Sequence, residues 1–459
     1  MIAWLAALVA LLVPSAASAT GAQVTLTRHG DDWVAHYVLP SDEEGWSFQR
    51  SSTIAGTDRP WRLASWTPHP DDARLARIGD VDVLLPPDGR ATVPRDVRIA
   101  FRPYEGGLNA DYAPALAFTD GALALFTGHF DVQPWSRAGG PDEDRSFHAS
   151  VSLEAPGDTI LVGGTTRRDR ARVEGAPTYA LLGASTPLSS DYLTAFVDPQ
   201  LPAWLREELF DFMPRTLELY AERMGPRRGT AKPTVMIDWD GPTPGRNSLG
   251  GSTLEGLVVM AMEGDAVLDR NQDMLDRIHW FIAHESAHFW LGQTVQYAQE
   301  KDAWIMEGGA DLAAIRASLD SDPAYDSATW LARAWNDCRQ TLAGGSLETA
   351  RERGDYRGPY ACGAVLMMGA ESIETARGGD YFSFVRSLIE RHDDPATGVD
   401  GDEWLAAFAR AGASRRAVDL ARAIIEEPGD NPAALLADFA RASGIVTLFP
   451  PPIATPDAR

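Results

Sequence analysis

Positive charge is scarce in this 459-residue chain, and lysine is almost absent. Only Lys232 and Lys301 occur among 41 basic residues, against 65 acidic ones, so the formal net charge is −24. This balance excludes nucleic acid and anionic membrane surfaces as partners, because both attract clustered positive charge. Histidine is also scarce, with nine residues, so two histidines at a metal-binding spacing are informative.

An apolar run without lysine or arginine opens the chain at residues 1–19. It ends in Ala17-Ser18-Ala19, a pattern typical of a signal peptide and its cleavage site. The run is short and is interrupted by Pro14, so a retained membrane anchor is the less favoured alternative. We expect an exported protein, either periplasmic or secreted, with no further association with a membrane.

Residues 20–195 are predicted to form an all-β domain. Short runs of β-branched, aromatic and other apolar residues alternate there with clusters of proline, glycine and aspartate. The strand candidates are Trp33–Leu39, Val81–Leu85, Asp96–Phe101, Ala122–Phe126, His148–Leu153 and Thr159–Val162. No long repeat and no chemical motif occurs here, so we expect a sandwich or a saddle-like sheet.

After this domain the hydrophobic period changes to that of helices. The run from Leu201 to Met224 places apolar residues on one helical face, although Pro214 is expected to bend or divide the helix. A loop rich in glycine and proline is expected over residues 241–251, and a strand is expected at Gly256–Met260. Strands followed by helices predict an α+β protein.

The sequence His284-Glu285-Ser286-Ala287-His288 lies inside an apolar run with helical periodicity. The two histidines are four residues apart, so on a helix both imidazoles share one face and can reach one ion. Glu285 lies about 100° round the helix from His284. From there its carboxylate can reach the edge of such a site without being a ligand.

A zinc site that carries out chemistry has three protein ligands and an open position for water. Glu307 follows His288 after 18 residues, and a second helix can place its carboxylate opposite the first. Asp311, one turn later on the same face, can hold a ligand histidine by its other ring nitrogen. The sequence thus predicts one Zn²⁺ per chain, held by His284, His288 and Glu307. The alternative is a helix with two partly exposed histidines and an unrelated acidic helix.

The segment from His284 to Val295, HESAHFWLGQTV, resembles the gluzincin aminopeptidases, the group of aminopeptidase N and leukotriene hydrolase. In that family, HExxH is followed by a tryptophan and then by Gly-Asn and a β-branched residue. Trp290, Gly292 and Val295 match this pattern, and Gln293 stands where the family has asparagine. The chain is similar to a short, secreted member of the group.

The family's third ligand is a glutamate in a Trp-x-x-Glu-Gly segment, which Trp304 and Glu307-Gly308 match at the family's spacing. The resemblance implies a thermolysin-like catalytic domain behind an N-terminal β domain, with a short helical C-terminal part. The expected parts are a signal peptide at 1–19, the β domain at 20–195, the catalytic domain at 196–375, helices at 376–449 and an irregular tail at 450–459.

Two more residues receive roles only through the resemblance. The family's Gly-x-Met-Glu-Asn glutamate binds the free amino group of the substrate, and Glu255 in Ser252–Gly256 is the nearest match. The tyrosine of the family's Pro-Tyr-x-x-Gly segment steadies the oxyanion, and Pro359, Tyr360 and Gly363 match that segment. Without the resemblance, Glu255 is an ordinary loop glutamate and Tyr360 is a tyrosine packed at a helix start.

Cys338 and Cys362 are the two cysteines of the chain, and both fall in its helical part. In an exported protein an isolated pair favours a disulfide, and closing this loop would contribute roughly 3 kcal/mol. Two separate buried thiols are the alternative. Zinc ligation by these cysteines is not expected, because two histidines and a glutamate already complete the site.

These observations favour a zinc peptidase that acts on peptide substrates. Glu285 is expected to be the general base and then the general acid, and Tyr360 the donor to the oxyanion. If Glu255 anchors the amino terminus, the enzyme is an aminopeptidase, which is the favoured hypothesis. A zinc endopeptidase with the same mechanism and an exported, non-catalytic zinc- or peptide-binding protein are the alternatives.

Overall fold

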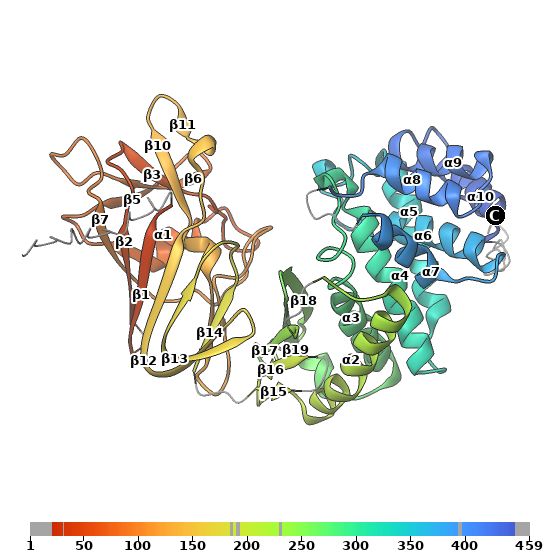
Figure 1. Cartoon of the computed structure of the whole chain (residues 1–459), viewed down its shortest axis with the longest axis horizontal. Helices are drawn as coiled ribbons and strands as arrows, with labels where there is room; N and C mark the ends of the chain where they lie inside the picture. The colour runs from red at the N-terminus through yellow and green to blue at the C-terminus, as the bar shows by residue number, and fades with distance from the viewer. Residues whose placement is uncertain are drawn as a thin grey trace, which may run out of the picture. The chain divides into compact units, whose positions relative to one another are not determined.

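The computed structural model describes residues 21–30, 32–183, 187–189, 193–228, 232–392 and 397–445. The predicted signal peptide and the predicted tail at 450–459 lie outside these residues. The described chain forms two compact units (Figure 1), one of residues 21–116 with 123–183 and one of residues 117–122 with 187–445. The predicted α+β class, with an N-terminal all-β domain followed by a largely helical part, is confirmed.

Two sheets make up the first unit. Among the described residues, one sheet has the order β4-β7-β2-β1-β12-β14-β9-β8 with β13 paired to β12, and the other has the order β11-β10-β3-β6-β5. The strands are β1 (Gln23–His29), β2 (Asp32–Val38), β3 (Gly45–Phe48), β4 (Trp66–Pro68), β5 (Arg74–Ile78), β6 (Val81–Leu85), β7 (Asp96–Phe101), β8 (Ala115–Ala117), β9 (Leu123–Phe126), β10 (Val132–Ser136), β11 (Gly140–Pro141), β12 (Ser150–Val162), β13 (Thr165–Val173) and β14 (Tyr179–Gly183). The helical turns are α1 (Trp61–Ser65), η1 (Thr127–Phe130) and η2 (Glu143–Arg145).

One pair of predicted strands in this unit proved to be a single strand. The candidates at residues 148–153 and 159–162 are joined in β12, whose register with β13 shifts between Glu154 and Thr159. Pro156 and Gly157 lie within this shift. A bulge accommodates the residues that break the ladder, so the strand bends and continues.

The second unit combines one sheet, in the order β15-β16-β17-β19-β18, with most of the helices. Its strands are β15 (Leu188–Ser189), β16 (Thr194–Val197), β17 (Thr234–Trp239), β18 (Asn247–Leu254) and β19 (Leu257–Gly264). Its helices are α2 (Ala203–Met224), η3 (Asp265–Leu268), α3 (Gln272–Ala287), η4 (Glu300–Asp302), α4 (Trp304–Ser321), α5 (Ser327–Gly344), η5 (Arg351–Arg353), α6 (Gly358–Thr375), α7 (Tyr381–Arg391), α8 (Gly401–Arg410), α9 (Arg415–Glu426) and α10 (Pro432–Ser443). Among the described helices, none is both long and apolar enough to cross a membrane.

This unit forms one compact body, in which the helices after residue 376 belong to the same unit as α3 and α4. The sheet and α2 lie at one end of it in Figure 1, and α8, α9 and α10 lie at the other. One large cluster of buried apolar residues runs through both regions. Helices α3, α4 and α6 therefore lie in the interior of the unit, with their facing sides removed from water.

Two local expectations differ from the structure. Helix α2 continues through Pro214, so division of the helix, one of the two effects expected of this proline, does not occur. The loop expected at residues 241–251 is wrong in its second half, because β18 pairs with β19 from Asn247 to Leu254. Glycine disfavours strands, but the hairpin ladder with β19 outweighs that preference.

Helices α4 and α6 meet at two glycines. A Cβ atom on Gly363 would lie 2.2 Å from the carbonyl oxygen of Trp304 and 2.9 Å from the Cα atom of Gly308. A Cβ atom on Gly308 would lie 2.2 Å from the carbonyl carbon of Gly363. The backbones of the two helices are thus in direct contact, and no side chain fits between them.

The predicted disulfide joins α5 to α6. The Sγ atoms of Cys338 and Cys362 are bonded at 2.05 Å, and both residues are fully buried. Cys362 lies two residues after Tyr360 at the start of α6. The covalent link therefore fixes the segment that carries this tyrosine.

Replacement of Gly363 by alanine should destabilise the protein by about 1–3 kcal/mol or more, because the obstructing atoms belong to backbone. Urea unfolding followed by circular dichroism measures the change. Gly344→Ala is the control, since a Cβ atom at that helical position meets nothing closer than 3.7 Å and should be neutral or slightly stabilising. Equal unfolding midpoints for wild type and Gly363→Ala would contradict the packing described.

Candidate metal centre

Helix α3 places the two histidines of HExxH on one buried face. It starts at Asn271, whose side chain caps the amide of Met274. His284 lies within the helix, and His288 occupies the C-cap with helical backbone angles, so the i, i+4 relation is kept. The chain then turns away at Gly292, whose φ of +123° favours glycine.

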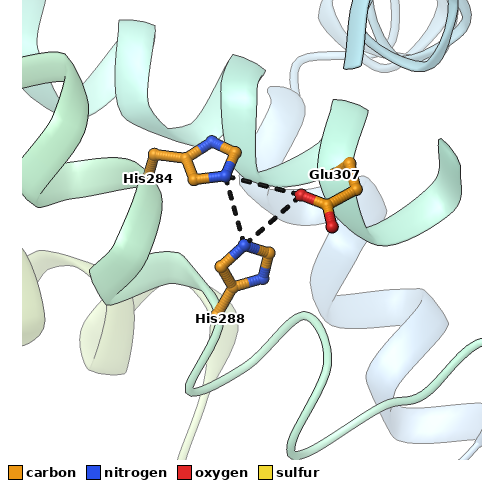
Figure 2. Close-up of side chains that lie close together, drawn as sticks. All are labelled: His284, His288 and Glu307. Atoms are coloured by element: carbon orange, nitrogen blue, oxygen red, sulfur yellow. Dashed lines mark hydrogen bonds and ion pairs between the residues drawn. The ribbon is translucent and has the colours of Figure 1, made fainter. Parts of the chain in front are cut away.

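Helix α4 brings Glu307 to the two histidines from the other side. Figure 2 shows the three side chains pointing toward one another. The Nε2 atoms of His284 and His288 are 3.1 Å apart. The Glu307 Oε2 atom lies 3.6 Å from His284 Nε2 and 3.5 Å from His288 Nε2. Three nitrogen and oxygen atoms from two helices thus converge on one point.

The remaining ring nitrogens are held by different partners. His284 Nδ1 lies 3.0 Å from the Oδ1 atom of Asp311, which is buried one turn after Glu307. His288 Nδ1 donates to the carbonyl oxygen of Leu291 at 2.8 Å. The hydrogen bond to Leu291 fixes the His288 ring, and the ion-pair contact with Asp311, which lacks hydrogen-bond geometry, orients His284. Both leave Nε2 directed at the centre of the cluster.

The cluster fits a small divalent cation. Among the described residues, His284, His288 and Glu307 are the one group of three whose ligand atoms all lie within 4.8 Å of one another. Ligand atoms at about 2.0–2.1 Å from a tetrahedral zinc ion lie about 3.3 Å apart, close to the observed separations. In addition, the buried Glu307 Oε2 has no hydrogen-bond partner in the described chain, and a cation would satisfy it.

Electrostatics within the cluster shift all three pKa values. Burial alone lowers the pKa of His284, but Asp311 and Glu307 outweigh burial and raise it from 6.5 to about 10. Burial likewise lowers the pKa of His288, and Glu307 reverses the direction. Burial raises the pKa of Glu307, but the two imidazoles outweigh burial and hold it well below its usual range. Without a metal, the imidazoles thus favour their protonated form beside the ionised Glu307. The proton then occupies the place that a cation can take.

Glu285 lies beside the cluster and against strand β18. A Cβ atom on Gly251 would lie 1.9 Å from Glu285 Oε1, so the carboxylate touches the strand backbone. Glu285 is buried, and burial raises the pKa of its carboxyl group above the ordinary value. It has no place among the three converging ligand atoms, as the sequence predicted from its position on the helix.

Tyr360 lies against the imidazole of His284. Its ring stacks on the imidazole with centroids 5.6 Å apart and planes inclined by 20°. Trp280 contacts the same imidazole at 5.4 Å, so His284 lies against two aromatic side chains. Burial and the carboxylates of Glu307 and Glu285 raise the pKa of Tyr360, so its hydroxyl stays protonated and can donate.

Glu255 is not placed with these residues. It is exposed in the turn between β18 and β19, and the amide of Gly256 donates to Gln293 Oε1 at 2.9 Å. Three residues separate Glu255 from Gly251, and Glu255 follows the end of β18, so the two Cα atoms are up to about 13 Å apart. The structure therefore brings together His284, Glu285, His288, Glu307, Asp311 and Tyr360, and it leaves Glu255 outside that group.

The described fold resembles that of an aminopeptidase N family protein. A solved structure of an aminopeptidase N family protein from Idiomarina loihiensis is similar over 91% of this chain and 78% of its own, with a TM-score of 0.63 and 11% sequence identity. An M1 zinc metallopeptidase from Deinococcus radiodurans is similar over 88% of this chain and 93% of its own, with a TM-score of 0.49 and 15% identity. No protein-family model matches the sequence, and no curated protein matches it significantly. The chain has an aminopeptidase N-type fold. This is the fold that the sequence resemblance implied.

Sequence reasoning missed three residues that contact the site. Gly251 borders Glu285, Trp280 packs on His284, and the Arg357 guanidinium lies over the Tyr360 ring at 5.7 Å. Trp280 is four residues before His284 on α3, a spacing that could have signalled a shared face. Arg357 is three residues before Tyr360 at the start of α6, which is also a spacing of neighbours on one helical face. Gly251 had no such local signal, because its contact with Glu285 crosses from β18 to α3.

The raised pKa of His284 predicts how the metal-free protein depends on pH. A folded pKa above 6.5 contributes stability that is complete below about pH 6.5 and is lost as the pH rises toward 10. The total change is on the order of a few kcal/mol. Urea unfolding of the chelator-treated protein between about pH 6.5 and 9.5 should show this decline. Asp311→Asn should show a shallower slope, and equal slopes for the two proteins would refute the assignment.

Proposed function

We propose that the protein is a zinc-dependent peptidase that is exported to the periplasm or to the medium. The observation that carries the proposal is the buried convergence of His284, His288 and Glu307 with Glu285 beside it. The aminopeptidase N-type fold supports the same reaction class. Export rests on the predicted signal peptide at residues 1–19, which the sequence alone supports.

His284, His288 and Glu307 would hold the zinc ion. A zinc ion on three such ligands acts as a Lewis acid and makes water easier to deprotonate. A purely structural zinc site has four protein ligands and needs no base. The three-ligand set with a buried carboxylate next to it therefore favours catalysis over the alternative of a non-catalytic binding protein.

Glu285 is the residue that takes the proton of the attacking water and passes it to the leaving amine nitrogen. Its raised pKa makes it a stronger base than an exposed glutamate. Tyr360, which stacks on His284, donates its hydroxyl hydrogen to the carbonyl oxygen on which negative charge develops. Asp311 keeps the ligand histidine in orientation throughout.

Strand β18 suits an extended peptide. It is the last strand of its sheet, and no other described strand pairs with its outer edge. A Cβ atom on Gly250 would meet nothing within 4 Å, and Gly251 touches Glu285. A substrate that pairs with this edge would bring its backbone past the general base, and no side chain of Gly250 or Gly251 would obstruct it.

The position of Glu255 favours an endopeptidase as a second candidate. The aminopeptidase hypothesis needs a carboxylate that binds the substrate's free amino group near the metal. Glu255 is exposed at the β18–β19 turn, three residues beyond Gly251, which contacts Glu285. An enzyme that holds its substrate mainly by the edge of β18 would not require a free amino terminus.

The proposed function is tested with a panel of aminoacyl-coumarins and their N-acetylated forms. We expect zinc-loaded wild type to cleave members of the panel, and we expect a chelator to abolish cleavage until zinc is restored. Glu285→Gln should keep one zinc per chain and lose about 10²–10⁴-fold in kcat, because the proton acceptor is gone. A Glu285→Gln protein with wild-type activity would refute the mechanism.

The same panel separates the two kinds of peptidase. Cleavage restricted to free-amine substrates, with a raised KM in Glu255→Gln, would establish the aminopeptidase. Equal or better cleavage of the acetylated substrates would establish the endopeptidase. Wild type that binds zinc but cleaves no peptide, including longer ones, would contradict the peptidase proposal and favour the binding protein.

A further inference from the structure

Arg357 lies immediately before α6 and three residues before Tyr360. The Cζ atom of its guanidinium is 5.7 Å from the centroid of the Tyr360 ring. The guanidinium carbon is within the distance of a cation–π contact with the tyrosine. Tyr360 is therefore in contact with the imidazole of His284 and with a permanently charged arginine.

Two carboxylates from other helices hold this guanidinium. Arg357 Nε donates to Asp337 Oδ2 at 3.2 Å, and Arg357 Nη1 lies 3.8 Å from Asp311 Oδ2. Asp337 is adjacent to Cys338, whose disulfide with Cys362 joins α5 to α6. The carboxylate that anchors the arginine is thus covalently linked to the helix that carries Tyr360.

We propose that Arg357 is a positioning residue that holds the Tyr360 ring against His284, so that the tyrosine hydroxyl meets the developing oxyanion. This inference rests on the proposed peptidase function. In the described part of the chain, the Arg357 side chain interacts with Asp337, Asp311 and Tyr360, and none of these interactions involves the converging ligand atoms or Glu285. The contact with Tyr360 is the proposed route to the reaction, and the zinc affinity distinguishes it from a route through Asp311 and His284.

If Arg357 only formed surface ion pairs, its replacement would leave catalysis unchanged. The Arg357 side chain is 39% exposed, so its ion pairs alone contribute little to stability. Arg333 offers a matched control, since it is exposed and its guanidinium lies 5.3 Å over the ring of Trp330 on α5. It makes the same type of contact without touching Tyr360 or Asp311.

The test compares Arg357→Met, Arg357→Lys, Arg333→Met, Tyr360→Phe and the double variant Arg357→Met/Tyr360→Phe. Two quantities are measured on the zinc-loaded proteins: kcat and KM for a cleaved peptide, and the Kd for a phosphinic pseudo-dipeptide. The tetrahedral phosphinate imitates the oxyanion, so its binding reports on Tyr360 without turnover. The zinc affinity of each metal-free protein is measured as well.

We expect Arg357→Met to lower kcat about 10-fold with KM changed less than about 2-fold, and to weaken phosphinate binding about 10-fold. Arg357→Lys should lose less kcat and less phosphinate affinity than Arg357→Met. Lysine keeps the positive charge but lacks the planar guanidinium. The double variant should match Tyr360→Phe within about 2-fold, since the arginine acts through the tyrosine. Arg333→Met should equal wild type, and zinc affinity should change less than about 3-fold throughout.

Wild-type kcat and phosphinate affinity in Arg357→Met would overturn the inference, and so would losses that add fully to those of Tyr360→Phe. Wild type that cleaves no peptide would refute the proposed function. A loss of phosphinate affinity in Arg357→Met would still support the position of Tyr360 in that case. Wild type that neither cleaves peptides nor binds the phosphinate would overturn both.

Discussion

Two imidazoles and a carboxylate lie between α3 and α4 in a largely apolar interior. The residues around them provide the polar contacts that these groups require. A buried charge without a partner costs several kcal/mol, so each group here needs a fixed neighbour. Asp311 and the carbonyl of Leu291 hold the outer nitrogens of the histidines. The two Nε2 atoms and the Glu307 carboxylate oxygen then face one another, and only a bound proton or a cation can satisfy all three.

Close backbone contact then determines where the chemical groups lie. Gly251 allows β18 to reach the carboxylate of Glu285, and Gly308 and Gly363 allow α4 and α6 to touch. Gly308 directly follows Glu307, and Gly363 lies three residues after Tyr360. The positions of Glu307, Glu285 and Tyr360 therefore depend on close contacts that leave no room for a methyl group on Gly251, Gly308 or Gly363. A substitution at such a tightly packed site disturbs the positions of the chemical groups before it unfolds the protein.

The predictions from the sequence succeeded where the controlling interactions are local. The four-residue spacing of His284 and His288 and the same spacing of Glu307 and Asp311 follow from helical periodicity, so their convergence could be anticipated. Tyr360 could be assigned only through the family resemblance, because nothing in its own neighbourhood points to His284. The aminopeptidase N-type fold followed from the same resemblance.

The remaining features depend on pairing between distant segments. Strand β18 was expected to be partly a loop because its glycines disfavour strands, yet the ladder with β19 orders it. That ladder places Gly251 beside Glu285. The arginine over Tyr360 is held by Asp337 and Asp311, which lie on two other helices, and no spacing rule relates these residues. Sequence periodicity predicts which residues share one face of a helix or strand. It does not predict which faces pack against each other.

The most direct test of the account is the coordination of zinc in the purified protein. Metal analysis with X-ray absorption at the zinc edge should give one zinc per chain, bound by nitrogen and oxygen at about 2.0–2.2 Å with an imidazole signature. Replacing His288 or Glu307 by alanine should remove most of that zinc. Sulfur neighbours at about 2.3 Å, or full zinc occupancy after both replacements together, would contradict the central claim.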